Sequence, residues 1–450
     1  MPPSGLFAGL EFRISPEPFS LTPTLAKELD SLGRVFLQFY RAVNLLYRLS
    51  AAGKQPRWVA AWLDQGKPSE LIELQRSPAL KNDLPRVIRP DLLITEKGLA
   101  LTELDSVPGG IGLTAWLNQT YSRWGETPGE PSQEIQGSSG ASPHREKAEV
   151  IGGADGMLRG FASIFGGAER VHLVVSEEAA TYRPEMNWIV AQQNPPQFAV
   201  RDTKFFDFTP GDAVYRFFEM FDLANVANAQ RIFSLAQEKQ IRLTPQPKTF
   251  FEEKMLFALL WNRNLRGFWH QELGERFLQR LLEIVPRTWI VDPSPLPPHA
   301  AIPGLDLTDW SQLKGLSQRE RDLILKISGF SEQAWGARGV YLGSDLSTTE
   351  WSAAVDLALR SFPQSPYVLQ TYEKPALVDS SWCDFAKNEI VPMKGRARLC
   401  PYYFVSGEES AARAELGGVL ATICPADKKI IHGLKEAILA PCSAAEANGR

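Results

Sequence analysis

A short apolar stretch near residue 100 carries charged residues that a buried strand would exclude. Residues 89–110 read RPDLLITEKGLALTELDSVPGG and contain Arg89, Asp91, Glu103 and Asp105. Because side chains alternate along a strand, Glu103 and Asp105 share one face, where two carboxylates repel unless a cation lies between them. Carboxylate oxygens, completed by water and phosphate oxygens, are the ligands that Mg²⁺ prefers. The stretch therefore predicts a magnesium site, the alternative being a solvated strand face.

A second stretch has the features of a phosphate site. Lys326 ends the apolar run DLILK and precedes ISGFSEQAWGARGV, which contains Gly336 and Gly339. At such a site the backbone approaches the phosphate closely while a cation holds its charge. The glycine spacing is not that of a P-loop, and the alternative is a hairpin with a surface lysine.

Three further candidates are weak when taken singly. Lys254 lies in EEKMLFALLW, an amphipathic helix on which a lone lysine is usually solvated. Gln370 interrupts YVLQTY, an apolar strand that ends near Tyr372. Arg396 and Arg398 alternate on one strand, which indicates either an anion contact or the surface of a sheet.

The elements that would position these residues follow from their periodicity. Residues 86–106 predict two strands joined at 96–98 by a hairpin turn. Helices are expected over 22–82, the first of them beginning after Thr22, a plausible N-cap.

Later segments alternate in type. In 150–245, strands alternate with helices, which predicts a small parallel α/β unit, although no Gly-x-Gly-x-x-Gly follows a strand to support a dinucleotide site. Residues 127–149 are rich in Pro, Gly and Ser and predict a flexible loop. Further helices and strands follow from 246, and KKIIHGLKEAILA at 428–440 predicts a closing helix.

Composition narrows the class of protein. The chain has 450 residues and a formal net charge of −4, so a dedicated nucleic-acid binder, which would be basic, is not expected. The four cysteines and five histidines form no metal-binding or disulfide pattern. Neither a signal peptide nor an apolar run long enough to span a bilayer is seen, so we expect a cytoplasmic protein without membrane partners.

Taken in order, these signals resemble the circularly permuted branch of the ATP-grasp ligases, the glutathionylspermidine synthetase-like carboxylate–amine ligases. The family's R-x-D motif, its later E-x-N or E-x-D motif and its glycine turn match 89–91, 103–105 and 108–110. The lysine helix, the lysine strand with its glycine loop, and a hinge strand at 367–370 follow in the family's order. Asp105 stands where many members have Asn, and Ile327 replaces the usual Pro after the lysine.

The resemblance implies a mixed fold of the α+β / α/β class, a circularly permuted ATP-grasp with a small Rossmann-like pre-ATP-grasp unit. It implies N-terminal helices and the metal-binding hairpin in 1–126, the pre-ATP-grasp-like unit in 150–245, and the ATP-grasp lobes and hinge in 246–450. The implied cofactors are ATP and Mg²⁺. The implied reaction joins a small-molecule carboxylate to an amine through an acyl phosphate.

The resemblance also implies roles for single residues. Metal ligands would be Asp91, Glu103 and Asp105, and nucleotide contacts would come from Lys254, Lys326, Gly336, Gly339, Gln370 and Tyr372. Arg338 would contact the transferred phosphate, and Arg89 would orient the substrate carboxylate or the acyl phosphate, because a guanidinium suits bidentate oxyanions. Two alternatives remain: a non-catalytic nucleotide-binding or scaffold protein with this fold, and a small-molecule phosphotransferase. The three retained acids favour an enzyme.

Overall fold

The computed structural model describes residues 6, 11–123, 149–193, 197–334, 338–433 and 435–445. Apart from Glu149, the predicted flexible loop at 127–149 lies outside the described residues, and so does Gly336.

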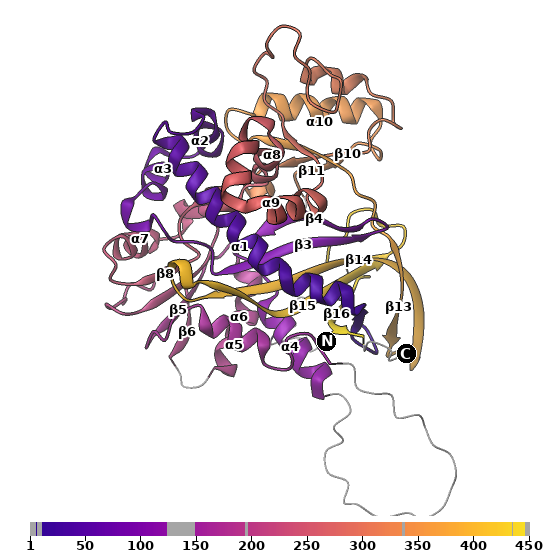
Figure 1. Ribbon diagram of the computed structural model, residues 1–450. Coiled ribbons are helices and arrows are strands. Elements are labelled where there is room, and N and C mark those ends of the chain that lie inside the picture. Colours follow the sequence, from indigo (N-terminus) through magenta and orange to yellow (C-terminus); the bar gives the residue numbers. More distant parts are fainter. Residues whose placement is uncertain are drawn as a thin grey trace, which may run out of the picture.

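The largest sheet joins strands from both ends of the described chain (Figure 1). Its strand order is β1-β16-β15-β14-β3-β4, with β13 paired to β14 and β2 paired to β16. The bounds are β1 (Arg13–Ile14), β2 (Phe19–Leu21), β3 (Val87–Thr95), β4 (Gly98–Asp105), β13 (Leu377–Asp384), β14 (Glu389–Ser406), β15 (Arg413–Pro425) and β16 (Ile438–Ala444). The β3–β4 pair is the hairpin expected over 86–106, and this prediction is confirmed.

Helices cover both faces of the large sheet, because its central strands are apolar on both sides. In β14, Leu399 and Tyr403 pack with the helices of one face, whereas Tyr402 and Phe404 pack with those of the other. The first layer consists of α1 (Pro23–Ala51), α8 (Met255–Trp261) and α9 (Arg266–Ile284), and the second includes α4 (Ile111–Arg123) and α5 (Gly156–Ser163). Two short helices, α2 (Arg57–Asp64) and α3 (Ser69–Gln75), follow α1. Thr22 caps α1 as expected, with its hydroxyl accepting from the Leu25 N–H.

A second sheet is wholly parallel and lies beyond the second helix layer. Its order is β6-β5-β7-β8, and α6 (Arg183–Gln192) and α7 (Ala229–Gln237) belong to the same segment. The bounds are β5 (Val171–Val175), β6 (Phe198–Arg201), β7 (Ala213–Phe217) and β8 (Arg242–Thr244). The strand–helix alternation in 150–245 correctly indicated this parallel pairing.

The third sheet is antiparallel and forms, with α10 (Thr348–Ser361), the upper lobe of Figure 1. Its order is β11-β10-β12-β9, with β9 (Thr288–Ile290), β10 (Leu323–Ile327), β11 (Val340–Leu342) and β12 (Tyr367–Thr371). Leu323, Leu325 and Ile327 pack into the core under α10. Strand alternation turns Lys326 to the opposite face.

One expected element is wrong. The predicted closing helix at 428–440 is not formed in its described residues, and residues 438–440 begin β16, which lies between β15 and β1 in the large sheet. Ile438 to Ser443 are all buried. A strand inside a sheet buries both of its faces, so its apolar run does not alternate and resembles that of a buried helix.

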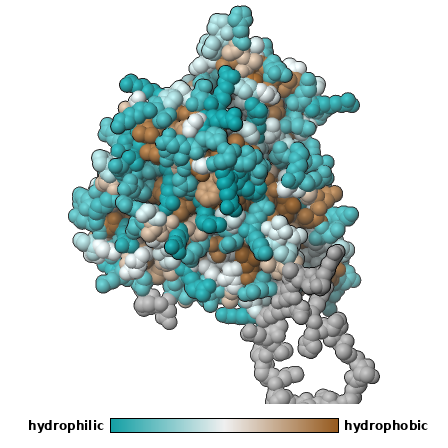
Figure 2. All heavy atoms as spheres, in the orientation of Figure 1, coloured by the Kyte–Doolittle hydropathy of each residue, from teal (hydrophilic) through white to brown (hydrophobic). Residues whose placement is uncertain are grey.

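On the face shown in Figure 2, hydrophilic residues predominate and apolar ones are scattered. No helix in the described ranges is both long and apolar enough to cross a membrane.

Candidate functional site

A cavity of about 700 Å³ lies where the three sheets meet. One wall is the β3–β4 hairpin with β14, and a second comes from β10 and β12. Residues that follow β5 and β7, such as Glu178 and Glu219, form a third side, and the loop at 429–433 forms a fourth. The carboxyl ends of parallel strands are the usual ligand edge of such a sheet.

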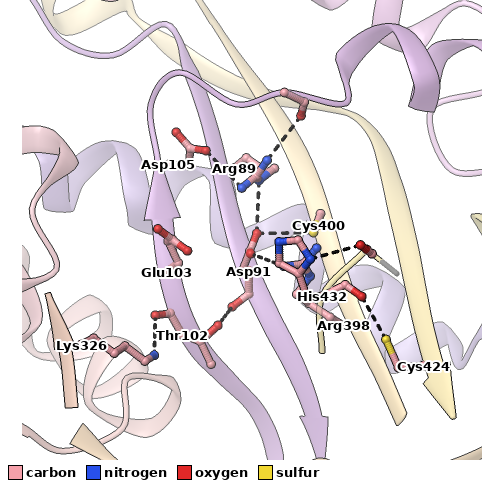
Figure 3. A network of polar contacts seen from close by, with 12 residues as sticks. Arg89, Asp91, Thr102, Glu103, Asp105, Lys326, Arg398, Cys400, Cys424 and His432 are labelled. Atoms are coloured by element: carbon pink, nitrogen blue, oxygen red, sulfur yellow. Dashed lines mark hydrogen bonds and ion pairs between the residues drawn. The ribbon is translucent and has the colours of Figure 1, made fainter. Parts of the chain in front are cut away.

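The hairpin brings its four charged residues to the cavity in two opposed pairs. Arg89 lies opposite Asp105, and Asp91 lies opposite Glu103. All four line the cavity, as Figure 3 shows for the two strands.

A bulge in β4 produces this arrangement. The register of the hairpin shifts between Asp91 and Leu92, so that Thr102 is the extra residue in β4. Leu101 and Leu104 both pack in the core under the first helix layer, although they are three positions apart. A bulge of one residue reverses the facing of all that follows, and here it turns Glu103 and Asp105 to the cavity. Strict alternation would have placed them on the face of Leu101.

Asp91 is held by two arginines. Its Oδ1 lies 3.1 Å from Arg89 Nε and its Oδ2 lies 2.8 Å from Arg398 Nη1. Its side chain is only 4% exposed. Burial alone would raise the pKa of Asp91, but the charges of Arg398 and Arg89 outweigh it and lower the pKa. The carboxylate is therefore ionised, and both of its oxygens are engaged.

The other two acids are also paired but keep solvent-facing surface. Glu103 Oε1 lies 2.7 Å from Lys254 Nζ, and Asp105 Oδ2 lies 3.1 Å from Arg89 Nη2. Their side chains are 39% and 28% exposed. Burial, and next the charge of Glu103, raises the pKa of Asp105 although Arg89 opposes both.

The predicted metal site does not fit the residues as they are arranged. In the parts of the chain that the structure describes, no group of three or more His, Cys, Asp or Glu side chains is placed to hold a metal ion. A cation at Asp91 would have to displace two guanidiniums, which leaves Glu103 and Asp105 as the acids with accessible oxygens. Binding of Mg²⁺ by these three acids remains a prediction.

Lys326 lines the cavity and has no acidic partner among the described residues. Its Nζ donates to Gln370 Oε1 over 2.9 Å and to the Thr102 carbonyl over 3.2 Å. Within the described residues it forms no ion pair, and it is 8% exposed. Burial lowers its pKa to about 8, since the charge of Glu103 opposes this only in part and that of Lys254 adds to it. At neutral pH the lysine is mostly charged, and an anionic ligand would match this charge.

Lys254 differs from Lys326 in this respect. Burial would lower its pKa, but the ion pair with Glu103 outweighs burial and raises the pKa. Its charge is thus already matched inside the protein.

The predicted hinge residues line the cavity, yet their side chains have partners. Gln370 accepts from Lys326 and donates through Nε2 to Thr288 Oγ1 over 2.9 Å. Its amide therefore orients the lysine. The hydroxyl of Tyr372 donates to the Lys429 carbonyl over 3.1 Å, which joins β12 to the loop at 429–433.

The predicted glycine loop is only partly at the cavity. Arg338 is exposed and lines it. Gly339 does not: a Cβ there would lie 2.7 Å from Ile327 Cγ2, so the glycine allows close packing against β10. Gly336 lies outside the described residues.

Three further groups were missed. Arg398 holds Asp91, and its alternation with Arg396 was a signal too weak to act on. Arg216, which is fully buried, lies 2.5 Å from Glu252 at the cavity. Glu185 accepts the backbone N–H groups of residues 110 and 112 at the start of α4, and burial raises its pKa to about 7 although these hydrogen bonds oppose it. No sequence pattern marks these last two contacts, which join distant segments.

Comparison with known proteins places the fold. No protein-family model matches the sequence, and no curated protein matches it. A glutathione synthetase-like effector from Globodera pallida, solved in its apo form, superposes with a TM-score of 0.53 at 10% identity, over 96% of this chain and 90% of that one. A putative gamma-glutamylcysteine synthetase from Methylobacillus flagellatus has a TM-score of 0.40 at 11% identity, over 89% and 86%, which is too low to carry an argument. The chain thus has a mixed α/β fold similar to that of the glutathione synthetase-like effector.

Proposed function

We propose that this protein is an ATP-dependent carboxylate–amine ligase with a circularly permuted ATP-grasp fold. The observation that carries the proposal is the buried Lys326, which has no acidic partner among the described residues and faces a cavity of about 700 Å³ opposite a charged hairpin. The permuted order is supported by the large sheet, in which the hairpin from the start of the chain pairs with β14 from its end.

The phosphates of ATP are assigned to the end of the cavity where cations gather. Lys326 supplies an unmatched charge there, and Arg338 supplies an exposed guanidinium on the same wall. Phosphoryl transfer needs charge neutralisation and positioning from the protein, with little covalent work. Both groups can meet a developing negative charge without first losing an acidic partner inside the described chain.

The adenine is assigned to the rim formed by the end of β12 and the loop at 429–433. Tyr372 and Ile430 line this rim and offer an aromatic and an aliphatic surface. Ile430 is 40% exposed, so its side chain offers an apolar surface on which a flat ring can pack.

The organic substrates are assigned to the side of the cavity at the carboxyl ends of β5 and β7. A carboxylate oxygen of the substrate attacks the γ-phosphorus, ADP leaves, and an acyl phosphate forms. The amine then attacks the carbonyl carbon, and inorganic phosphate leaves with the C–O electron pair. Arg89 bonds Asp91 and Asp105, so it orients a substrate only by sharing these bonds.

A second candidate is a non-catalytic nucleotide-binding protein that keeps the fold. It is favoured by the pairing of Asp91, Glu103 and Asp105 with cations, which leaves no three-acid metal site among the described residues. The similar structure from Globodera pallida is itself described as an effector. A third, a small-molecule phosphotransferase, would yield a stable phosphorylated product and no amide.

The test is ADP release from ATP with mixtures of carboxylates and amines, followed by mass spectrometry of the products. We expect ADP release beyond a single turnover to require both substrates and to be lost in Glu103→Gln. The matched control is Glu389→Gln, which changes an exposed acid on β14 that does not line the cavity. ATP binding without any amide product would favour the second candidate, and a phosphorylated product the third.

A further inference from the structure

The two lysines of the proposed phosphate site come from separate segments, yet they meet the same strand. Lys254 precedes α8 and reaches Glu103, while Lys326 lies on β10 and reaches the carbonyl of Thr102, the neighbouring residue of β4. Some structure must hold these two segments at a fixed separation.

Ser328 makes the direct connection. It follows Lys326 by two residues and is fully buried. Its carbonyl accepts the Lys254 N–H over 2.9 Å, and its hydroxyl oxygen accepts the Met255 N–H over 3.0 Å. The lysine-bearing turn before α8 is therefore hydrogen-bonded to the end of the lysine-bearing strand.

Glu253 and Lys67 extend this connection on the side away from the cavity. The Ser328 hydroxyl donates to Glu253 Oε2, and Glu253 Oε1 lies 2.6 Å from Lys67 Nζ. The side chains of Lys67 and Glu253 are 1% and 2% exposed, and neither they nor Ser328 line the cavity. Gly329 makes room for this contact, because a Cβ there would lie 2.9 Å from Glu253 Cδ.

Lys67 is itself fixed on both sides. Its Nζ also donates to the Leu63 carbonyl at the end of α2. The preceding Gly66 has φ +74°, and a Cβ there would lie 1.8 Å from the Gln364 carbonyl oxygen. The chain at Gly66 therefore packs closely against the segment between α10 and β12 of the third sheet. Gln65 Nε2 donates to the Pro363 carbonyl over 2.7 Å.

A buried ion pair is a poor source of net stability, because the desolvation of both charges offsets their attraction. In some proteins a buried polar or ionic group instead selects one geometry. We infer that Lys67, Glu253 and Ser328 are positioning residues that set the separation of Lys254 and Lys326 for nucleotide phosphates. The inference rests on the proposed function and assigns these residues no contact with substrate.

The principal test compares Ser328→Ala with wild type for ATP affinity, by calorimetric titration, and for melting temperature. We expect a loss of affinity of about 10- to 100-fold, since displacing a site by about 1 Å has effects of this size. The matched control is Lys248→Met. Lys248 is also buried, donates to Asn44 Oδ1 over 2.9 Å and does not line the cavity, so its loss lowers the melting temperature but leaves ATP affinity unchanged. Equal ATP affinity in Ser328→Ala and Lys248→Met overturns the inference.

A double variant distinguishes a loss of affinity caused by misplaced lysines from one caused by a buried charge left without its partner. Lys67→Met or Glu253→Gln alone leaves a buried group without its partner, whereas the pair of changes keeps shape and removes both charges. Because Gln at 253 still accepts from Ser328, the double variant should bind ATP more tightly than either single variant. Additive losses of affinity contradict the inference.

A readout without nucleotide distinguishes failure of this inference from failure of the proposed function. The pH midpoint for modification of Lys326 by a small acylating reagent reports its ionisation, on which the charges of Glu103, Lys254 and Asp91 act. Ser328→Ala keeps the carbonyl bond to the Lys254 N–H but loses the hydroxyl bond to the Met255 N–H, which loosens the turn that carries Lys254. Movement of Lys254 away from Lys326 should raise this midpoint, since the charge of Lys254 lowers the pKa of Lys326. If wild type binds no ATP but the midpoint rises in Ser328→Ala, the proposed function fails, whereas the positioning role of Lys67, Glu253 and Ser328 (the positioning set) stands. An unchanged midpoint overturns the positioning set.

Discussion

On the β3–β4 hairpin, Arg89, Asp91, Glu103 and Asp105 each have a partner of opposite charge, whereas on the small antiparallel sheet Lys326 has none among the described residues. We call the side of the cavity formed by the β3–β4 hairpin the hairpin wall. Its charges are matched by partners within the protein, and they mainly hold one another in place. We call the side formed by β10 and β12 the lysine wall. There the buried Lys326 keeps a positive charge that no described acid matches. The difference teaches that charged residues brought to one cavity by the fold need not all face the ligand.

The largest expected effect is on stability and lies in the hairpin wall. Asp91→Asn leaves Arg398 and Arg89 facing a neutral amide, and removing one partner of buried charges costs about 3–5 kcal/mol of unfolding free energy. Glu103→Gln, in a pair that is partly exposed, should cost about 1 kcal/mol or less. Urea denaturation of the metal-free variants measures both.

Equal stabilities of these two variants would remove the distinction between the engaged and the accessible acids. Asp105→Asn serves as the intermediate case, because Arg89 keeps its bond to Asp91.

The next effect is a dependence of binding on pH in the lysine wall. The pKa of Lys326 is about 8, so ATP affinity should fall as pH rises through 8, by about tenfold at pH 9 if the charge is essential. Lys326→Arg, which stays charged, should bind ATP with nearly the same affinity at pH 7 and pH 9. Titrations at the two pH values decide this, and a pH-independent wild type would contradict it.

The same group affects stability with the opposite sign. The unfolded pKa of a lysine is about 10.4, above the folded value of about 8. The unfolded chain therefore binds more protons between these values, and the stability of wild type should rise with pH there relative to Lys326→Met.

The smallest effect concerns metal removal. Three free carboxylates would repel a triphosphate strongly without Mg²⁺, but these acids are already matched by cations. We therefore expect EDTA to weaken ATP binding by about fivefold or less, the equivalent of one exposed charge interaction. Equal affinity with and without EDTA would exclude any role for the hairpin acids in metal-dependent binding, and a loss of several orders of magnitude would restore the three-acid site.

What the sequence could predict was local. The hairpin and the parallel pairing follow from patterns over a few residues, and the structure agrees with both. The bulge at Thr102 escaped prediction, because both registers leave the same apolar pattern and only the packing of Leu101 and Leu104 selects one.

What the sequence could not predict was pairing over long separations. Asp91 meets Arg398 across about 300 residues because β14 pairs with β3, and no local pattern specifies that neighbour. The same holds for the hydrogen bonds of Gln370 to Lys326 and Thr288, while its expected contact with the nucleotide stays a prediction.

The central claim is that the lysine wall binds the phosphates of ATP. It is tested most directly by calorimetric titration of ATP into wild type, Lys326→Met and Lys254→Met at pH 7. The account predicts saturable binding to wild type, a loss of about 10- to 100-fold in Lys326→Met, and a smaller loss in Lys254→Met, whose charge Glu103 already matches. Unchanged affinity in Lys326→Met, or no binding to wild type, would contradict it.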